Sequence, residues 1–104
     1  LSSKADRHML RKRYANYLGR ASGYVYLVTD GTIYKIGQTG DVCSRMTVMQ
    51  KKEGRPLHLL RVIQTSNRTR LENHLLDKFN DKHLGHEWFA LTPEDVEYIM
   101  ELAV

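Results

Sequence analysis

The stretch that decides the fold is GYVYLVTDGTIYKIG, residues 23–37. Its outer parts, residues 24–28 and 33–37, are rich in β-branched and aromatic side chains, which favour strands. Asp30-Gly31 between them is a favoured two-residue hairpin turn, because both turn positions need a positive φ. The stretch therefore predicts a β-hairpin, and two strands joined by such a tight turn must be antiparallel.

The rest of the chain adds helices and one more strand to this hairpin. Cap residues, glycine stops and the spacing of apolar residues indicate where these elements begin and end. In order, we predict a helix over 42–52 capped by Asp41 and ended by Gly54, a strand over 57–63, a helix beginning within 66–69, an extended segment over 87–91 and a helix opened by Thr92-Pro93. The predicted fold class is α+β, with a small antiparallel sheet of three strands (24–28, 33–37 and 57–63) flanked by helices.

The positive charge of the chain is concentrated at its start. Residues 1–20 hold six basic residues and one acidic residue, and their apolar residues recur at helical spacing. We expect a basic N-terminal helix over 1–20, followed by one domain over 21–104. Such a segment suits a polyanion such as nucleic acid, although an ordinary solvated helix explains the charge equally well. The nucleic-acid-binding residues expected here are Arg7, Arg11, Lys12 and Arg13.

Composition limits the partners, metal sites and cellular compartment that we expect for the protein. No apolar stretch approaches the roughly 20 residues of a membrane span, so no membrane partner is expected. Cys43 is the single cysteine, which excludes an intrachain disulfide and favours a reducing, cytoplasmic compartment. The histidines show no zinc-binding spacing. Because the chain begins with Leu1, we expect it to be part of a longer protein with further domains.

One ordered set of motifs resembles the GIY-YIG nuclease superfamily. The set consists of Gly23-Tyr24-Val25-Tyr26, Tyr34-Lys35-Ile36-Gly37, Arg45, Glu72 and Glu87-Trp88-Phe89. It is similar to the phage and bacterial branch in which "KIG" replaces "YIG". The resemblance implies a GIY-YIG-like fold and a metal-dependent endonuclease that cleaves phosphodiester bonds, with Mg²⁺ or Mn²⁺ as cofactor. DNA is the expected partner, with RNA left open.

The resemblance also implies a role for each matching residue. Glu72 is expected to bind the metal, and Arg45 to hold phosphate oxygens as charge develops. Tyr26 is expected to orient the attacking water or to remove its proton. The second role requires Lys35, Arg45 or the metal to lower the tyrosine pKa from about 10. Strand alternation sends Tyr26 and Lys35 towards one surface, opposite the main core, where Gly37 leaves room for a phosphate.

Other interpretations of these residues remain open. Thr69-Arg70-Leu71-Glu72 fits a capping box, so Glu72 has a structural explanation. Trp88 and Phe89 are expected to be core anchors. Many members of the superfamily carry a histidine at the place of Met49, and some members of this branch carry one at the place of Leu76. A catalytically weak nucleic-acid-binding module on the same fold is therefore the alternative function. A protein-interaction domain is a third possibility, suggested by the acidic C-terminal helix.

Overall fold

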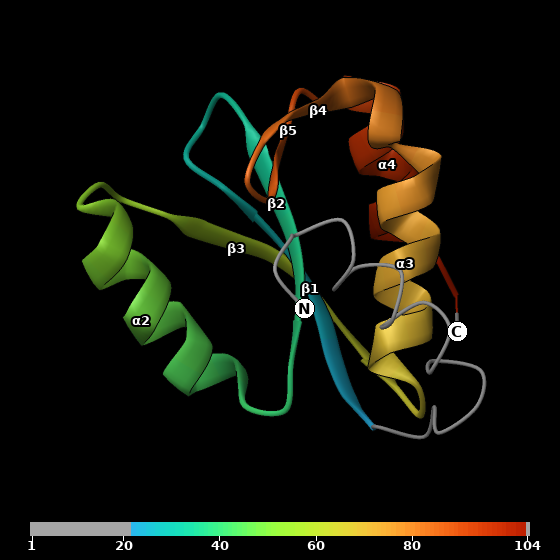
Figure 1. The fold of residues 1–104 in the computed structure, drawn as a ribbon, viewed down its shortest axis with the longest axis horizontal. Helices are drawn as coiled ribbons and strands as arrows, with labels where there is room; N and C mark the ends of the chain where they lie inside the picture. Colours follow the sequence, from blue (N-terminus) through green and yellow to red (C-terminus); the bar gives the residue numbers. More distant parts are fainter. Residues whose placement is uncertain (1–21, 104) are drawn as a thin grey trace, which may run out of the picture.

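A computed structural model describes residues 22–103 of the chain (Figure 1). The expected basic helix over 1–20, with its four proposed nucleic-acid contacts, lies outside these residues. No helix in the described part has the length and apolar character needed to cross a bilayer. The elements are β1 (Gly23–Thr29), β2 (Tyr34–Thr39), α2 (Val42–Glu53), β3 (His58–Thr65), α3 (Arg68–Lys78), a 3₁₀ turn η1 (Asn80–Lys82), β4 (His83–Gly85), β5 (Trp88–Phe89) and α4 (Pro93–Glu101).

The strands form one antiparallel sheet in the order β3-β1-β2-β5-β4. The α+β class is confirmed, but the expected count of three strands was wrong, because β4 and β5 extend the sheet beyond β2. These two strands have three and two residues. β5 lies within the extended segment predicted over 87–91, although it was not counted in the sheet. A strand as short as β4 contains too few alternating positions for the sequence pattern to reveal it. Their hairpin carries Glu87 to the edge of β2.

The connection between β1 and β2 differs from the two-residue turn expected from Asp30-Gly31. Thr29 pairs with Tyr34, so the loop spans residues 30–33. The Asp30 carboxylate accepts hydrogen bonds from the backbone N–H groups of Thr32 and Ile33. In this loop Gly31 alone has a positive φ, of 105°. A side chain that hydrogen-bonds its own loop stabilises a turn that needs only one left-handed residue.

The helix starts follow local rules, with one correction. Asp41 caps α2 by accepting from the backbone N–H of Ser44, and Gly54 ends the helix with a left-handed φ of 66°. The capping box at the start of α4, between Thr92 and Asp95, is also present. α3 begins at Arg68, within the expected 66–69, and its cap is Asn67, which corrects the capping-box interpretation at Thr69.

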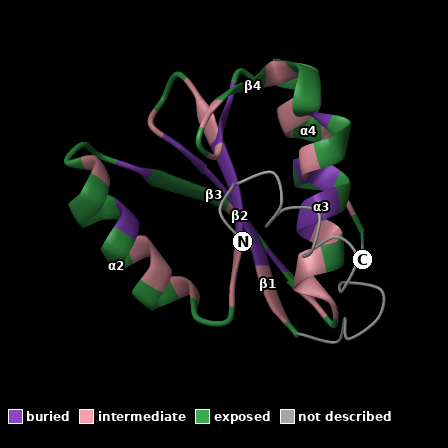
Figure 2. Cartoon of the chain, in the orientation of Figure 1, coloured by how far each residue is buried: buried purple, intermediate pink, exposed green. Residues whose placement is uncertain are grey.

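The helices cover opposite faces of the sheet. One face carries the main core, in which strand residues pack against α3 and α4: Val25, Leu27, Ile36, Leu75, Phe79, Phe89, Leu91 and Ile99. The other face carries a smaller cluster against α2, made of Tyr26, Val28, Met49, Leu57 and Trp88. Figure 2 shows the buried residues gathered on the central strands and on the side of α3 that faces them. Trp88 and Phe89 are core anchors, as expected, one on each face.

Candidate active site

The candidate site lies where the second half of β2 lacks a neighbouring strand. β5 pairs with β2 at Tyr34 and Lys35, so in the described part of the chain residues 36–39 have no strand on that edge. Side chains from both faces of the sheet meet beside this open edge. They enclose a cavity of about 370 Å³, lined by Tyr26, Gln38, Thr39, Gly40, Arg45, Arg68, Glu72 and Glu87. Three of the four residues predicted to be catalytic, Tyr26, Arg45 and Glu72, are thus brought together.

Tyr26 is held in place by the glycine opposite it in the hairpin. The two residues are partners in the β1–β2 register. A Cβ atom built on Gly37 would lie 2.2 Å from the Tyr26 hydroxyl oxygen and 2.3 Å from the ring carbon that bears it. The ring therefore covers the space that a side chain would need. The Tyr26 ring thus occupies the space beside Gly37 that was expected to admit a phosphate.

Arg45 reaches Tyr26 from the first turn of α2. Its Nε donates a hydrogen bond of 3.3 Å to the Tyr26 hydroxyl oxygen. Burial raises the pKa of Tyr26 above its usual value of 10.0, and the charge and hydrogen bond of Arg45 offset this only in part. The protein surroundings therefore keep the proton on Tyr26 at neutral pH. They do not provide the lowered pKa that a proton-abstracting tyrosine needs.

Glu72 is buried near the start of α3, with 3% of its surface exposed. Its Oε1 accepts a hydrogen bond of 3.0 Å from Nε2 of Gln38, and Oε1 of Gln38 accepts one of 3.2 Å from the Thr69 hydroxyl. The capping-box interpretation is wrong, since Asn67 caps this helix and Thr69 bonds to Gln38 instead. Burying a carboxylate is costly unless it is paired or binds a cation. This position therefore suits a functional group.

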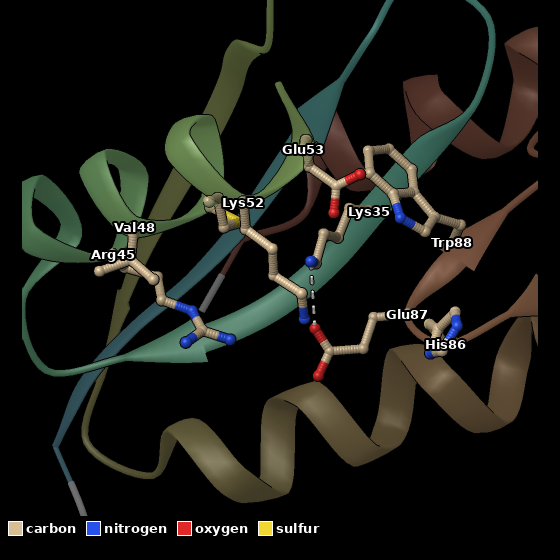
Figure 3. Close-up of a pocket in the computed structure, with 9 residues that line it drawn as sticks. Lys35, Arg45, Val48, Lys52, Glu53, His86, Glu87 and Trp88 are labelled. Atoms are coloured by element: carbon tan, nitrogen blue, oxygen red, sulfur yellow. Dashed lines mark ion pairs between the residues drawn. The ribbon is translucent and has the colours of Figure 1, made fainter. Parts of the chain in front are cut away.

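Lys35 lies in a neighbouring cavity of about 480 Å³, which shares Arg45 and Glu87 with the first (Figure 3). Only 5% of Lys35 is exposed. Its Nζ is 3.7 Å from Oε2 of Glu87 and 5.5 Å from the centre of the Trp88 ring. Tyr26 and Lys35 were expected to face an open surface of the sheet, but α2 and Trp88 cover that surface. Glu87 links Lys35 to the other site residues.

One comparison with known proteins relates the chain to a nuclease-associated family. Residues 23–104 match the T5orf172 domain, whose family is associated with nucleases. The chain belongs to this family. No curated protein and no solved structure matched the chain. The match begins at the first strand of the hairpin, so it covers every residue that lines the candidate site of this T5orf172 domain.

Two carboxylates, Glu72 and Glu87, line the main cavity of the T5orf172 domain. Within residues 22–103, no three His, Cys, Asp or Glu side chains form a group that could hold a metal ion. This donor set fits Mg²⁺, which is usually bound through one or two carboxylates together with water and phosphate oxygens. It does not fit structural zinc, which takes four protein ligands.

Three residues of this site were missed by sequence reasoning. Gln38 orients Glu72, Arg68 adds a second guanidinium group, and Glu87 adds a second carboxylate. The sequence did carry one signal, because Glu87 stands directly before Trp88-Phe89 in the motif that supports the resemblance. Nothing local distinguishes Gln38 or Arg68 from surface residues, since their role depends on packing between distant segments.

Proposed function

We propose that this domain is a metal-dependent endonuclease of the GIY-YIG superfamily, in the branch where "KIG" replaces "YIG", and that it hydrolyses phosphodiester bonds in DNA. The proposal rests mainly on one observation. Tyr26, Arg45 and Glu72 come from three separate elements and line one cavity at the open edge of β2. Membership of a nuclease-associated family supports the same conclusion.

Arg45 binds the scissile phosphate in this proposal. Its Nε already donates to Tyr26, so its terminal nitrogens are the donors for two non-bridging oxygens. The hydrogen bond to Tyr26 fixes the guanidinium plane before substrate binds. Donors fixed in this way stabilise the charge that develops in the transition state without having to reorganise.

Tyr26 and Glu87 act on the attacking water. The protein surroundings raise the pKa of Tyr26, so in this proposal Tyr26 orients the water by hydrogen bonding and Glu87 accepts the proton that the water loses. The water oxygen forms a bond to phosphorus, the bond to one bridging oxygen breaks, and the leaving oxygen takes a proton from solvent. Lys35 holds Glu87 in position through their ion pair.

Glu72 would hold the Mg²⁺ or Mn²⁺ ion, and Glu87, which lines the same cavity, would remain the proton acceptor. When bound, the ion neutralises negative charge on the phosphate and on the leaving oxygen. Gln38 keeps the Glu72 carboxylate in a fixed orientation, in the way that outer residues commonly orient metal ligands.

A second candidate function is DNA binding without efficient cleavage. It is favoured by Met49, which stands where many members of the superfamily carry a histidine. Met49 is 3% exposed and packs from α2 into the smaller cluster. Its side chain supplies no acid or base to the site.

A plasmid nicking assay with magnesium or manganese tests the proposal. We expect Glu72→Gln to reduce nicking by roughly a thousandfold, because the amide is a poor ligand for a hard divalent ion. Magnesium-free DNA affinity should stay equal or rise, since a carboxylate repels phosphate. Arg45→Ala should weaken both binding and nicking, because its charge acts on the phosphate with or without metal.

Glu97→Gln is the matched control, because Glu97 is exposed on α4 and loses the same charge. It should leave both measurements unchanged. Nicking at the wild-type rate by Glu72→Gln would defeat the catalytic assignment. A wild-type protein that binds DNA but never nicks it would favour the second candidate function.

A further inference from the structure

A second arginine, Arg68, lies at the same cavity, and two glycines set its position. Arg68 is the first residue of α3. A Cβ atom on Gly23 would lie 2.8 Å from the Arg68 Cδ, and one on Gly40 would lie 2.7 Å from its Nη1. The arginine side chain therefore crosses both glycines closely, and a larger residue at either place would displace it.

The part of the chain that the structure describes does not fully satisfy the guanidinium of Arg68. Its Nε is buried and has no hydrogen-bond partner within residues 22–103. Buried donors are almost always hydrogen-bonded, so such an arginine is suited to a ligand that brings acceptors. Arg55, by contrast, forms ion pairs with Asp30 and Glu53. The planar donor fork of arginine matches the oxygens of a phosphate.

The charged side chains around the cavity also favour the binding of more than one phosphate. Glu72 and Glu87 contribute two negative charges, and Arg45 and Arg68 contribute two positive charges. Lys35, which pairs with Glu87 from the neighbouring cavity, adds a further positive charge. A bound divalent ion would therefore leave the site with a clear excess of positive charge, which suits more than one phosphodiester. Arg45 comes from α2 and Arg68 from α3, and these helices cover opposite faces of the sheet.

We propose that Arg68 binds the backbone phosphate next to the one that Arg45 holds, and so positions the DNA strand in the site. This inference rests on the proposed function, because it assumes that the cavity receives nucleic acid. It assigns to Arg68 substrate binding and not chemistry, so its effect should appear in affinity more than in the rate of the bound complex.

The test measures the binding of a fluorescent DNA duplex without magnesium, at several salt concentrations. We expect Arg68→Gln to weaken binding about tenfold, as the loss of charge-assisted hydrogen bonds to phosphate predicts. The slope of log affinity against log salt should fall by about 0.9, the value for one phosphate contact. Arg70→Gln is the matched control, because Arg70 is exposed on the same helix and carries the same charge.

Gly40→Ala tests the position of the Arg68 side chain without removing its charge. Gly40 does not have a positive φ, so alanine is tolerated by the backbone there, but its methyl group would push the Arg68 guanidinium away. We expect weaker DNA binding with an unchanged melting temperature.

If Arg68→Gln weakens binding no more than Arg70→Gln, the inference is wrong, while DNA binding and nicking by the wild type would still support the proposed function. Wild-type protein that neither binds nor nicks DNA would overturn both.

Discussion

The two faces of the sheet are built from alternate residues of the same strands, yet they differ in kind. The face under α3 and α4 buries a continuous apolar core that includes Val25, Leu27 and Phe79. The face under α2 buries Tyr26 in its cluster and carries the buried Lys35 beside it. One hairpin can place an apolar core on one face and polar, buried side chains on the other, because neighbouring residues point to opposite faces. Substitutions on the two faces should therefore affect different measurements.

The largest effect on stability should come from the main core. Phe79→Ala removes a ring that is 2% exposed, and we expect it to lower the free energy of unfolding by about 3–5 kcal/mol. Tyr26→Phe removes only a hydroxyl group and should cost about 1 kcal/mol, the usual net contribution of one hydrogen bond. Urea denaturation measures both. Equal losses for the two variants would show that the faces are not specialised in this way.

A smaller effect on stability should follow from Gly37→Ala, which sharpens the comparison on the α2 face. The new methyl group would overlap the Tyr26 ring, so the ring must move and its hydrogen bond with Arg45 must lengthen or break. We expect a loss of about 1–3 kcal/mol in stability together with strongly reduced nicking. Tyr26→Phe serves as the partner in a double-mutant cycle. Additive effects on nicking would contradict the idea that Gly37 acts through Tyr26.

The smallest effect should be a pH dependence of stability. Because burial raises the pKa of Tyr26 above 10.0, the unfolded chain loses this proton at a lower pH than the folded chain. Below pH of about 10 both states are protonated and Tyr26 contributes no pH dependence. As pH rises further, the unfolded state is stabilised and the free energy of unfolding falls. The fall should be steeper in the wild type than in Tyr26→Phe when urea titrations are compared between about pH 8 and pH 11.

Much of the fold could be predicted because its signals are local. The hairpin, the third strand, the Asp41 cap and the Thr92 capping box each depend on residues a few positions apart. The start of α3 within 66–69 was predicted, but the capping box at Thr69 was wrong, because Asn67 caps the helix. Packing decided between them, since Thr69 bonds to Gln38, a residue 31 positions away.

The site was predicted in part, and through resemblance more than through physics. Tyr26, Arg45 and Glu72 were selected by matching motifs, and the structure places them at one cavity. The raised pKa of Tyr26 could not be foreseen, because burial depends on how α2 closes over the sheet. Arg68 escaped notice because a basic residue at a helix start resembles an ordinary surface charge. The roles assigned to all of these residues remain predictions.

The pairing of Tyr26 with Gly37 makes the site inseparable from correct folding. If the hairpin slipped by one residue, every side chain of one strand would turn to the other face. Tyr26 would then enter the main core and Val25 or Leu27 would face α2, so the core and the site would be lost in the same event. If the domain cleaves DNA as proposed, a population of these molecules should contain active copies and inactive copies, with no well-folded copies whose tyrosine is misplaced. Specific activity then reports the fraction of correctly registered chains.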